Sequence, residues 1–439
     1  MSIANAVANS SNQVILKSFA QIVKTNLPNN RWLSVRNYYL KETKDKVNDI
    51  PTPPAKPKPL AEYISASVLL HCYDGWNYLS RASESLLNGD VSSAIHFVYY
   101  SELRSVMSIM AFDGIGIFDK RHIWFDANHS ANHTAGHITT HTAAKDCITE
   151  WSKSATKKDV VFDLVRVNNH SLGEWIAATQ FSLKSSYSSA IVKEWFDRWS
   201  MDIRLKEDQT LRNEMSYRPH FEYSKVNIKE LVDSLNSIWT ALEPVGSSRF
   251  NDLDRHLFRI AIEKVYSKWK GRSATGQDFE NFVTRMFDTI GESKLGLYDF
   301  VLRRSEPNDH YILTEARKDV GKAKRRINLI SPLPMFCRAI LLSRISTGLS
   351  SKLIKHAPAS QEALRYWWEG LCKMTGIMKS TDGGEDATQL YADITECINE
   401  IAKAEVGDWD SVASAASNQS QNIQKIKQFQ RACFWGAGF

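Results

Sequence analysis

The residues best suited to chemistry lie in one short stretch, LRNEMSYRPH, which spans Leu211–His220. Proline is poorly tolerated inside a helix and disfavours helical geometry at the residue before it, so Pro219 predicts that a helix running from about Asp202 ends here. The end of that helix would present a guanidinium, an amide, a phenol and an imidazole, from Arg212, Asn213, Tyr217 and His220. Such a group could grip a phosphate and move a proton.

Helical spacing sets how these side chains relate to one another. Asn213 and Tyr217 are four residues apart and would share a face, whereas Tyr217 would lie about 140° around the helix from Arg212. Asp208, one turn before Arg212, could hold its guanidinium by an ion pair. The alternative is an ordinary charged helix end, in which Arg218 complements the helix dipole.

Composition narrows the class of protein. The chain has 439 residues, of which 43% are hydrophobic and 24% charged, and its formal net charge is +6. No stretch approaches the roughly 18 apolar residues of a membrane span, and no basic residue precedes Lys17 to begin a secretory signal. The six cysteines show no CxxC pair and no zinc spacing, which favours a reducing compartment. We therefore expect a cytoplasmic protein that does not act at a membrane.

The hydrophobic pattern predicts a mainly α-helical chain in three parts. Residues 1–59 form an N-terminal helical arm and a Pro-rich linker, PTPPAKPKP. Residues 60–245 form a helical domain, and residues 252–439 a second, mostly helical domain with a small β-hairpin or sheet. The main helices are predicted at Leu60–Leu87, Val91–Phe112, Ala143–Ser152, Val160–Phe181, Ser188–Ser200, Asp254–Lys270, Asp278–Ile290, Met335–His356 and Gln361–Met378.

A stretch rich in Gly, Asn, Thr and His runs from Asp113 to about Ala143. Its histidines recur every four residues, at His129, His133, His137 and His141. On a helix they would share one face, and zinc commonly takes two histidines at such spacing. Gly136 and the threonines disfavour a helix, and no acidic or cysteine ligand is interleaved. A polar surface loop is therefore favoured over a metal site, and we expect no metal.

Two segments within residues 60–235 carry a family resemblance. The first is the helix after Gly89-Asp90, SAIHFVYYSELRSVMSIMA, and the second is the helix that ends in Arg-Asn-x-x-x-Tyr. One side of the first helix carries residues four apart, which at this spacing are more often core than ligand contacts: His96, Tyr100 and Arg104. In this order the segments resemble the HEPN superfamily of helical ribonucleases and nucleotide-binding proteins.

The family is an α-helical bundle with a Tyr-Tyr-containing second helix. Its signature is an Arg, often followed by a polar residue, then four to six residues and a His. The resemblance assigns the Arg to Arg212 and the polar neighbour to Asn213. Tyr217 has the spacing of the His with another residue type, and His220 is a His one position too far.

The resemblance implies a metal-independent endoribonuclease in which a ribose 2′-hydroxyl attacks the adjacent phosphate. Arg212 would stabilise the charge that develops on the phosphate, His220 or Tyr217 would transfer protons, and Asn213 would orient the phosphate. Two such motifs face each other across a dimer interface in the family, so a homodimer is implied. Proteins of this kind often serve as toxins or anti-phage defence factors, which adds an antitoxin or defence-complex partner to the expectations. The alternative is a non-catalytic helical scaffold that binds nucleic acid or a protein.

A second resemblance lies further along the chain. Two runs with strand character, Leu295–Leu302 and His310–Glu315, follow a predicted helix and are joined by the turn-rich SEPND. This order resembles the core of PD-(D/E)xK nucleases and implies a Mg²⁺-dependent DNA nuclease with Arg317 at the family's Lys position. The residues of that alternative site are Glu280, Asp299, Glu315 and Lys318. A plain β-hairpin is equally compatible with the pattern.

Basic residues gather between Arg317 and Arg344, where Asp319 is the sole acid. Such an excess predicts a surface for a polyanion, although a solvated charged surface has the same composition. The residues expected to bind nucleic acid are Lys318, Lys322, Lys324, Arg325 and Arg326.

Overall fold

The computed structural model describes most of the chain. The ranges are 2–25, 57–119, 121–134, 136, 138–154, 157, 159–179, 201–217, 228–245, 249–318, 331–357, 360–374, 376–377, 387–403 and 417–438. They are mainly helical with two small antiparallel sheets, which confirms the predicted fold class. Within these ranges every helix is too short or too polar to cross a lipid bilayer.

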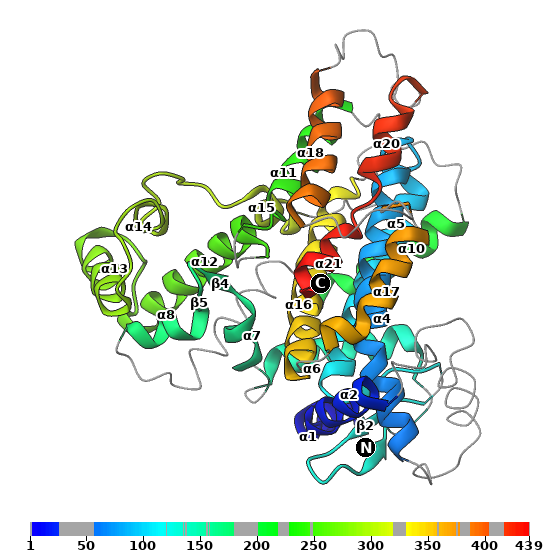
Figure 1. The fold of residues 1–439 in the computed structure, drawn as a ribbon. Helices are drawn as coiled ribbons and strands as arrows, with labels where there is room; N and C mark the ends of the chain where they lie inside the picture. Colours follow the sequence, from blue (N-terminus) through cyan, green and yellow to red (C-terminus); the bar gives the residue numbers. More distant parts are fainter. Residues whose placement is uncertain are drawn as a thin grey trace.

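Long helices form the centre of the molecule, and Figure 1 shows them beside one another. They are α4 (Pro57–Leu87), α5 (Val91–Phe112) and α16 (Leu333–His356). The turn between α4 and α5 depends on Gly89, whose φ is 77°, and on Asp90, which accepts the Ser93 N–H at 3.0 Å. A Cβ on Gly75 would lie 2.7 Å from the Ser105 hydroxyl, so glycine allows the two helices to approach closely.

The N-terminal helices cover one end of this centre. They are α1 (Ile3–Asn9), which contacts α6 (Thr140–Lys153), and α2 (Gln13–Thr25), which packs on α4. The apolar stripe of α2 is buried, as at Phe19 and Ile22. The predicted Pro-rich linker lies mostly outside the described residues, and its last residues already belong to α4, because proline is tolerated in a first helical turn.

Short strands occupy two segments of the predicted helical domain. β1 (Ile115–Gly116), β2 (Ile123–Phe125) and β3 (Ala131–His133) form an antiparallel sheet in the order β1-β2-β3, with Ile123 opposite His133. This sheet lies in the stretch that was expected to be a polar loop.

The predicted helix Val160–Phe181 is wrong in its middle. The chain forms α7 (Asp159–Leu164), the hairpin β4 (Arg166–Val167) and β5 (His170–Ser171), and then α8 (Leu172–Ala178). Asn168 and Asn169 both have positive φ, 49° and 67°. Asparagine tolerates this conformation, and a two-residue hairpin loop requires it. The predicted helix Ser188–Ser200 lies outside the described residues.

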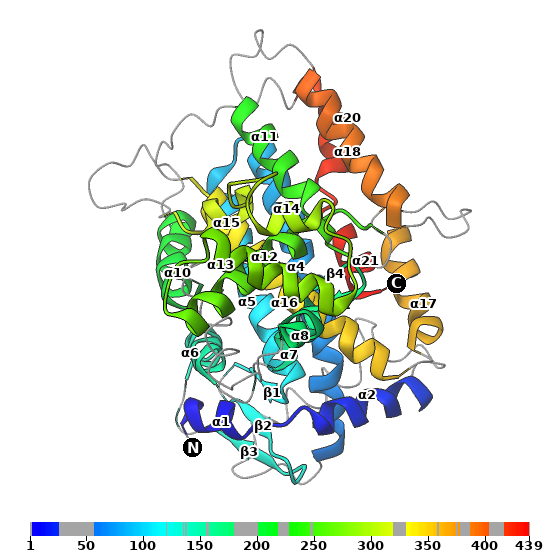
Figure 2. The same ribbon diagram turned by 90° about the vertical axis from the view of Figure 1, so that its left-hand side faces the viewer.

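A further group of helices lies on one side of the centre (Figures 1 and 2). It comprises α12 (Asn251–Lys270), α13 (Gly276–Ile290), α14 (Leu297–Val301) and α15 (Tyr311–Ala316), and α8 packs on α12 and α13.

The predicted strands Leu295–Leu302 and His310–Glu315 are wrong, because these runs form α14 and α15. Gly296 has a positive φ of 61°, which breaks the first run, and His310 caps α15 by accepting the Ile312 N–H. Short apolar runs do not distinguish a buried helix from a strand.

The remaining helices are α10 (Met201–Tyr217), α11 (Ile228–Thr240), α17 (Ser360–Met374), α18 (Ala387–Lys403), α20 (Ser420–Ile426) and α21 (Arg431–Ala437). Figure 1 shows α21 in the middle of the molecule, where it packs on α16 and α4. The Gln430 N–H donates to the Ser80 hydroxyl at 2.7 Å, which joins the start of α21 to α4. The three-part domain division stays a prediction, although α16 of the second predicted domain contacts α4 and α5 of the first.

Candidate functional site

Arg212 lies on α10, which packs against α5. Its guanidinium carbon is 5.0 Å from the ring centre of Tyr99 and 5.5 Å from that of Tyr100. A guanidinium at these distances is attracted by the negative face of each ring. The two tyrosines of α5 therefore position the cation.

Two imidazoles belong to the same group of side chains. Nδ1 of His96 on α5 is 3.0 Å from the Ser216 hydroxyl on α10. Nδ1 of His141, in the first turn of α6, is 2.8 Å from the Tyr99 hydroxyl. The ring centres of His96 and His141 are 4.9 Å and 6.4 Å from that of Tyr100. We call this group the Arg212 cluster: His96, Tyr99, Tyr100, His141, Arg212 and Ser216.

The cluster favours neutral imidazoles. Burial, and next the positive charge of Arg212, lower the pKa of both His96 and His141 below the ordinary 6.5. Burial raises the pKa of the Tyr99 phenol, which stays protonated. At neutral pH the cluster therefore holds one fixed cation beside two imidazoles that can accept a proton.

A buried ion pair supports α10 beneath the cluster. Both carboxylate oxygens of Asp208 accept hydrogen bonds from Arg338 of α16, with Nη2 2.8 Å from each. Glu102 of α5 lies 3.8 Å from the Arg338 guanidinium. Burial, and then Asp208, raise the pKa of Glu102 well above its ordinary value.

The predicted ion pair between Asp208 and Arg212 is therefore wrong. Arg338 is only 1% exposed and Asp208 only 2%, and a buried guanidinium requires a carboxylate partner. The Nε atom of Arg212 is buried without a hydrogen-bond partner in the described part of the chain.

Of the four predicted site residues, the structure places only Arg212 in the cluster. Asn213 is half-buried beside it, and the Tyr217 side chain at the end of α10 is 82% exposed. His220 lies outside the described residues. The roles of the other cluster members were not predicted, although the Tyr-Tyr pair and the four-residue spacing of His96 and Tyr100 were signals on α5.

The regularly spaced histidines do not share a helix face. His129 lies in a turn with a φ of 63°, His133 is on β3 and His141 is on α6, whereas His137 is outside the described residues. Across the ranges that the structure describes, no three His, Cys, Asp or Glu side chains are placed to hold a metal ion.

The carboxylates of the alternative nuclease site are divided between two places. Glu280 and Asp299 both approach Arg304, at 2.7 Å and 3.6 Å. Glu315 is buried on α15 and pairs with Lys318 at 2.5 Å. The adjacent strands that this site requires are helices, so the expected metal site is not formed by these residues.

Two basic residues of the segment from Arg317 to Arg344 do not lie on the surface. Arg338 and Arg344 are buried, and each is paired with an aspartate. Lys318 is paired with Glu315, as described above. The other predicted nucleic-acid contacts, Lys322, Lys324, Arg325 and Arg326, lie outside the described residues.

Comparison with protein-family models, with curated proteins and with solved structures finds no match for this chain. Its function must therefore be inferred from the geometry of its own residues.

Proposed function

We propose that this protein is a metal-independent endoribonuclease whose active site is the Arg212 cluster. The observation that carries the proposal is the guanidinium of Arg212 held over Tyr99 and Tyr100, with the imidazoles of His96 and His141 in the same cluster. One fixed cation and two proton-transfer groups are what cleavage of RNA by its own 2′-hydroxyl requires.

In this reaction one imidazole takes the proton of the 2′-hydroxyl, and the 2′-oxygen attacks the adjacent phosphorus. The guanidinium of Arg212 donates hydrogen bonds to the phosphate oxygens as negative charge builds on them. The bond from phosphorus to the 5′-oxygen breaks, and the second imidazole, in its protonated form, donates a proton to that oxygen. The products are a 2′,3′-cyclic phosphate and a free 5′-hydroxyl.

The hydrogen bonds of the cluster fit these roles. Ser216 and the Tyr99 hydroxyl each hold the Nδ1 atom of one imidazole, which leaves its Nε2 atom to face substrate. A bound phosphate would offset the charge of Arg212 and raise the pKa of a nearby imidazole, so that one of the two can carry a proton. This is why two histidines with lowered pKa in the free protein can serve as base and acid.

The wider expectations rest on this activity. In a homodimer, the second copy of the chain would approach α10, where Tyr217 is 82% exposed. The nucleic acid that the protein binds would be RNA. A role as a toxin or defence factor would follow if cleavage arrests growth when the protein is expressed.

The test is cleavage of an end-labelled RNA by the purified protein in EDTA. Wild type should cut the RNA and leave cyclic phosphate ends, and His141→Gln and Arg212→Ala should not. Arg285→Ala, on the surface of α13, is the matched control and should cut normally. Binding of RNA without cleavage would favour the non-catalytic scaffold. That alternative is also consistent with the finding that, of the four predicted site residues, the structure places only Arg212 in the cluster. In a separate assay, cleavage of DNA that requires added Mg²⁺ would contradict the proposal of a metal-independent ribonuclease.

A further inference from the structure

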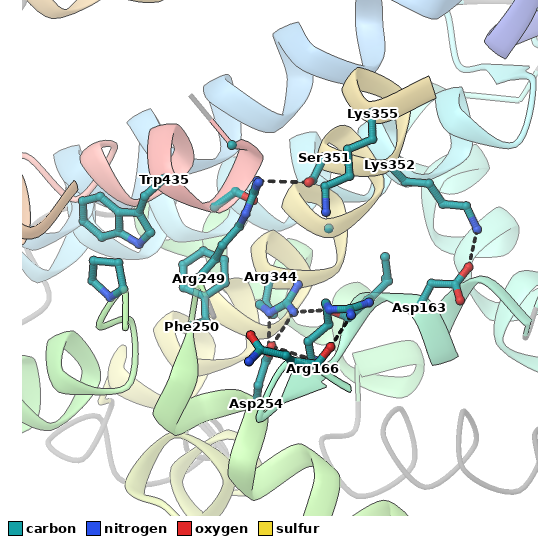
Figure 3. A pocket seen from close by; sticks show the side chains of 16 residues that line it. Asp163, Arg166, Arg249, Phe250, Asp254, Arg344, Ser351, Lys352, Lys355 and Trp435 are labelled. Carbon is teal, nitrogen blue, oxygen red and sulfur yellow. Dashed lines mark hydrogen bonds and ion pairs between the residues drawn. The ribbon is translucent and has the colours of Figure 1, made fainter. Parts of the chain in front are cut away.

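A second site lies away from the Arg212 cluster and shares no residue with it. A cavity of about 750 Å³ opens between α7, β4, the start of α12, α16 and α21 (Figure 3). Its charged lining comprises the cations Arg166, Arg249, Arg344, Lys352 and Lys355 and the carboxylates Asp163 and Asp254. We call this cavity the cationic pocket.

One face of α16 supplies most of these cations. Arg344, Lys352 and Lys355 follow helical spacing and, together with Gly348, line the cavity. A Cβ on Gly348 would lie 2.9 Å from both Nη1 of Arg344 and a methyl group of Leu164. Glycine at this position therefore lets the Arg344 side chain and α7 close the floor of the pocket.

The two carboxylates are each taken by one cation. Asp254 accepts Nε and Nη2 of Arg344, both at 2.9 Å, and Asp163 accepts Lys352 at 2.6 Å. Both pairs are visible in Figure 3. Arg166, Arg249 and Lys355 are the cations that remain after both lining carboxylates have been paired.

Two of the remaining cations, Arg249 and Arg166, donate side-chain hydrogen bonds to neutral groups in the described part of the chain. Nη1 of Arg249 donates to the Ser351 hydroxyl at 3.0 Å and to the Gly436 carbonyl at 3.1 Å. The Arg166 guanidinium donates to the Asn169 carbonyl. Lys355 is on the exposed side of α16 with its ammonium group toward the pocket (Figure 3). The lining thus carries three positive charges in excess of its carboxylates.

This excess is electrostatically costly in a confined space. Burial, and next the charge of Arg344, lower the pKa of Arg249. Lys355 is exposed on one side, but the partial burial of its ammonium group, and next the charges of Arg249 and Arg166, lower its pKa. An anion in the pocket would relieve the repulsion among these groups.

We propose that the cationic pocket binds a small ligand that carries two or more linked phosphate groups, such as a nucleoside triphosphate. Guanidinium groups match phosphate geometry with paired hydrogen bonds. Three unbalanced cations exceed the charge of a single phosphate, which favours a linked chain of them. The volume lies within the roughly 300–1,000 Å³ of small-molecule sites, and enclosure by five elements favours a compact ligand over a nucleic-acid strand.

The experiment is isothermal titration of the full-length protein with ATP and, separately, with inorganic tripolyphosphate, both in EDTA. We expect binding that weakens with salt, and a loss of affinity of at least about 10-fold in the double variant Arg166→Gln, Lys355→Gln, since each charge-assisted hydrogen bond is worth roughly a factor of ten. The variant Lys268→Gln, Arg285→Gln removes the same charge from the surfaces of α12 and α13 and should bind normally.

The two probes separate the sources of the ligand. Equal affinity for both means that the pocket recognises the phosphates alone, whereas a preference for ATP means that it also recognises the nucleoside. Either result supports the site if the double variant loses the binding. The absence of binding by both probes would overturn the proposal, as would a short RNA that displaces labelled ATP and binds more tightly. Because Arg212→Ala leaves this pocket intact, that variant should still bind, so failure here is distinct from failure of the proposed ribonuclease.

Discussion

Asp208 on α10 and Arg338 on α16 form a bidentate ion pair across the interior, with both side chains almost fully excluded from solvent. The pair sets the position of α10, the helix that carries Arg212. Both charges of the pair are buried, so removal of either side chain leaves the other as a buried charge without its partner.

Arg338→Met should lower the free energy of unfolding by about 3–5 kcal/mol at pH 7, because it leaves Asp208 and Glu102 buried without a cation. The loss should shrink as the pH falls, since burial already raises the pKa of both carboxyls and protonation removes their charge. Denaturant unfolding at several pH values measures this. The double variant Asp208→Leu, Arg338→Met should recover much of the stability, and a small, pH-independent loss in the single variant would contradict the prediction.

Arg212→Ala should abolish ribonuclease activity and any growth toxicity with little change in melting temperature. The side chain is half-exposed, and its contact with Tyr99 and Tyr100 contributes only about 0.5–1 kcal/mol at such a site. Arg212→Lys should also be weak, because an ammonium does not reproduce the paired hydrogen bonds of guanidinium to phosphate. Full activity of either variant would rule out the Arg212 cluster as the active site.

His141→Gln and His96→Gln should each lower single-turnover cleavage by about 10²–10⁴-fold, the usual loss for a general acid or base. In wild type, the dependence of kcat/KM on pH should be bell-shaped, because one imidazole must be neutral and the other protonated. Both limbs should lie at lower pH than ordinary histidines would give, since burial and Arg212 lower the pKa of both rings. Tyr99→Phe and Ser216→Ala, which remove the partners of Nδ1, should cost less. A pH profile unchanged in both histidine variants would exclude them as proton-transfer groups.

The same assay decides the role of the residues that sequence alone had favoured. If His220 transfers a proton, His220→Ala should cost as much as His141→Gln, and Tyr217→Phe should cost less than either. A large loss for Tyr217→Phe beside a neutral His220→Ala would make the phenol the working group. Circular dichroism of each variant controls for folding.

Replacement of Lys322, Lys324, Arg325 and Arg326 by Gln should weaken RNA binding and flatten its dependence on salt. Each phosphate contact contributes about 0.7–0.9 to the slope of log affinity against log salt concentration. Titrations at several salt concentrations give the slope. An unchanged slope would show that the segment is only a solvated charged surface.

The protein should lose stability as the pH falls from about 6.5 towards 4. Burial lowers the pKa of His310 from 6.5 to about 4, and its Nδ1 accepts the Ile312 N–H at 3.2 Å. The unfolded chain therefore binds the proton first as the pH falls, at a cost of about 3 kcal/mol once His310 also titrates in the folded state. Denaturant unfolding at pH 7 and pH 5 measures the change. His310→Asn, which keeps a capping side chain but does not titrate, should show a smaller loss.

Local signals made parts of this fold predictable. The capping Asp90 and the spacing of apolar residues gave the bounds of Val91–Phe112 as the structure has them. The hairpin at Asn168-Asn169 was missed because the apolar residues on both sides also fit a helix. The run Leu297–Val301 is too short for periodicity to separate helix from strand.

The candidate site was predictable only in part, because its contacts join distant segments. Arg212 stands out by residue type and by its place near a helix end. Its neighbours do not: 120 residues separate His96 from Ser216, and 42 separate Tyr99 from His141. Asp208 likewise pairs with Arg338, 130 residues away, and not with Arg212, four residues away. Only the packing of α5, α6, α10 and α16 decides such pairs.

The contact between Ser80 and Gln430 joins positions 350 residues apart, and it has a consequence for how the chain reaches its native state. The face of α4 that α21 covers stays open to solvent until α21 has been made and has docked. Closing so long a loop is entropically unfavourable and slows folding. We therefore expect a long-lived, partly folded species with an uncovered apolar surface, and a Trp435→Ala variant should accumulate in aggregates during refolding more than a surface variant such as Lys268→Gln.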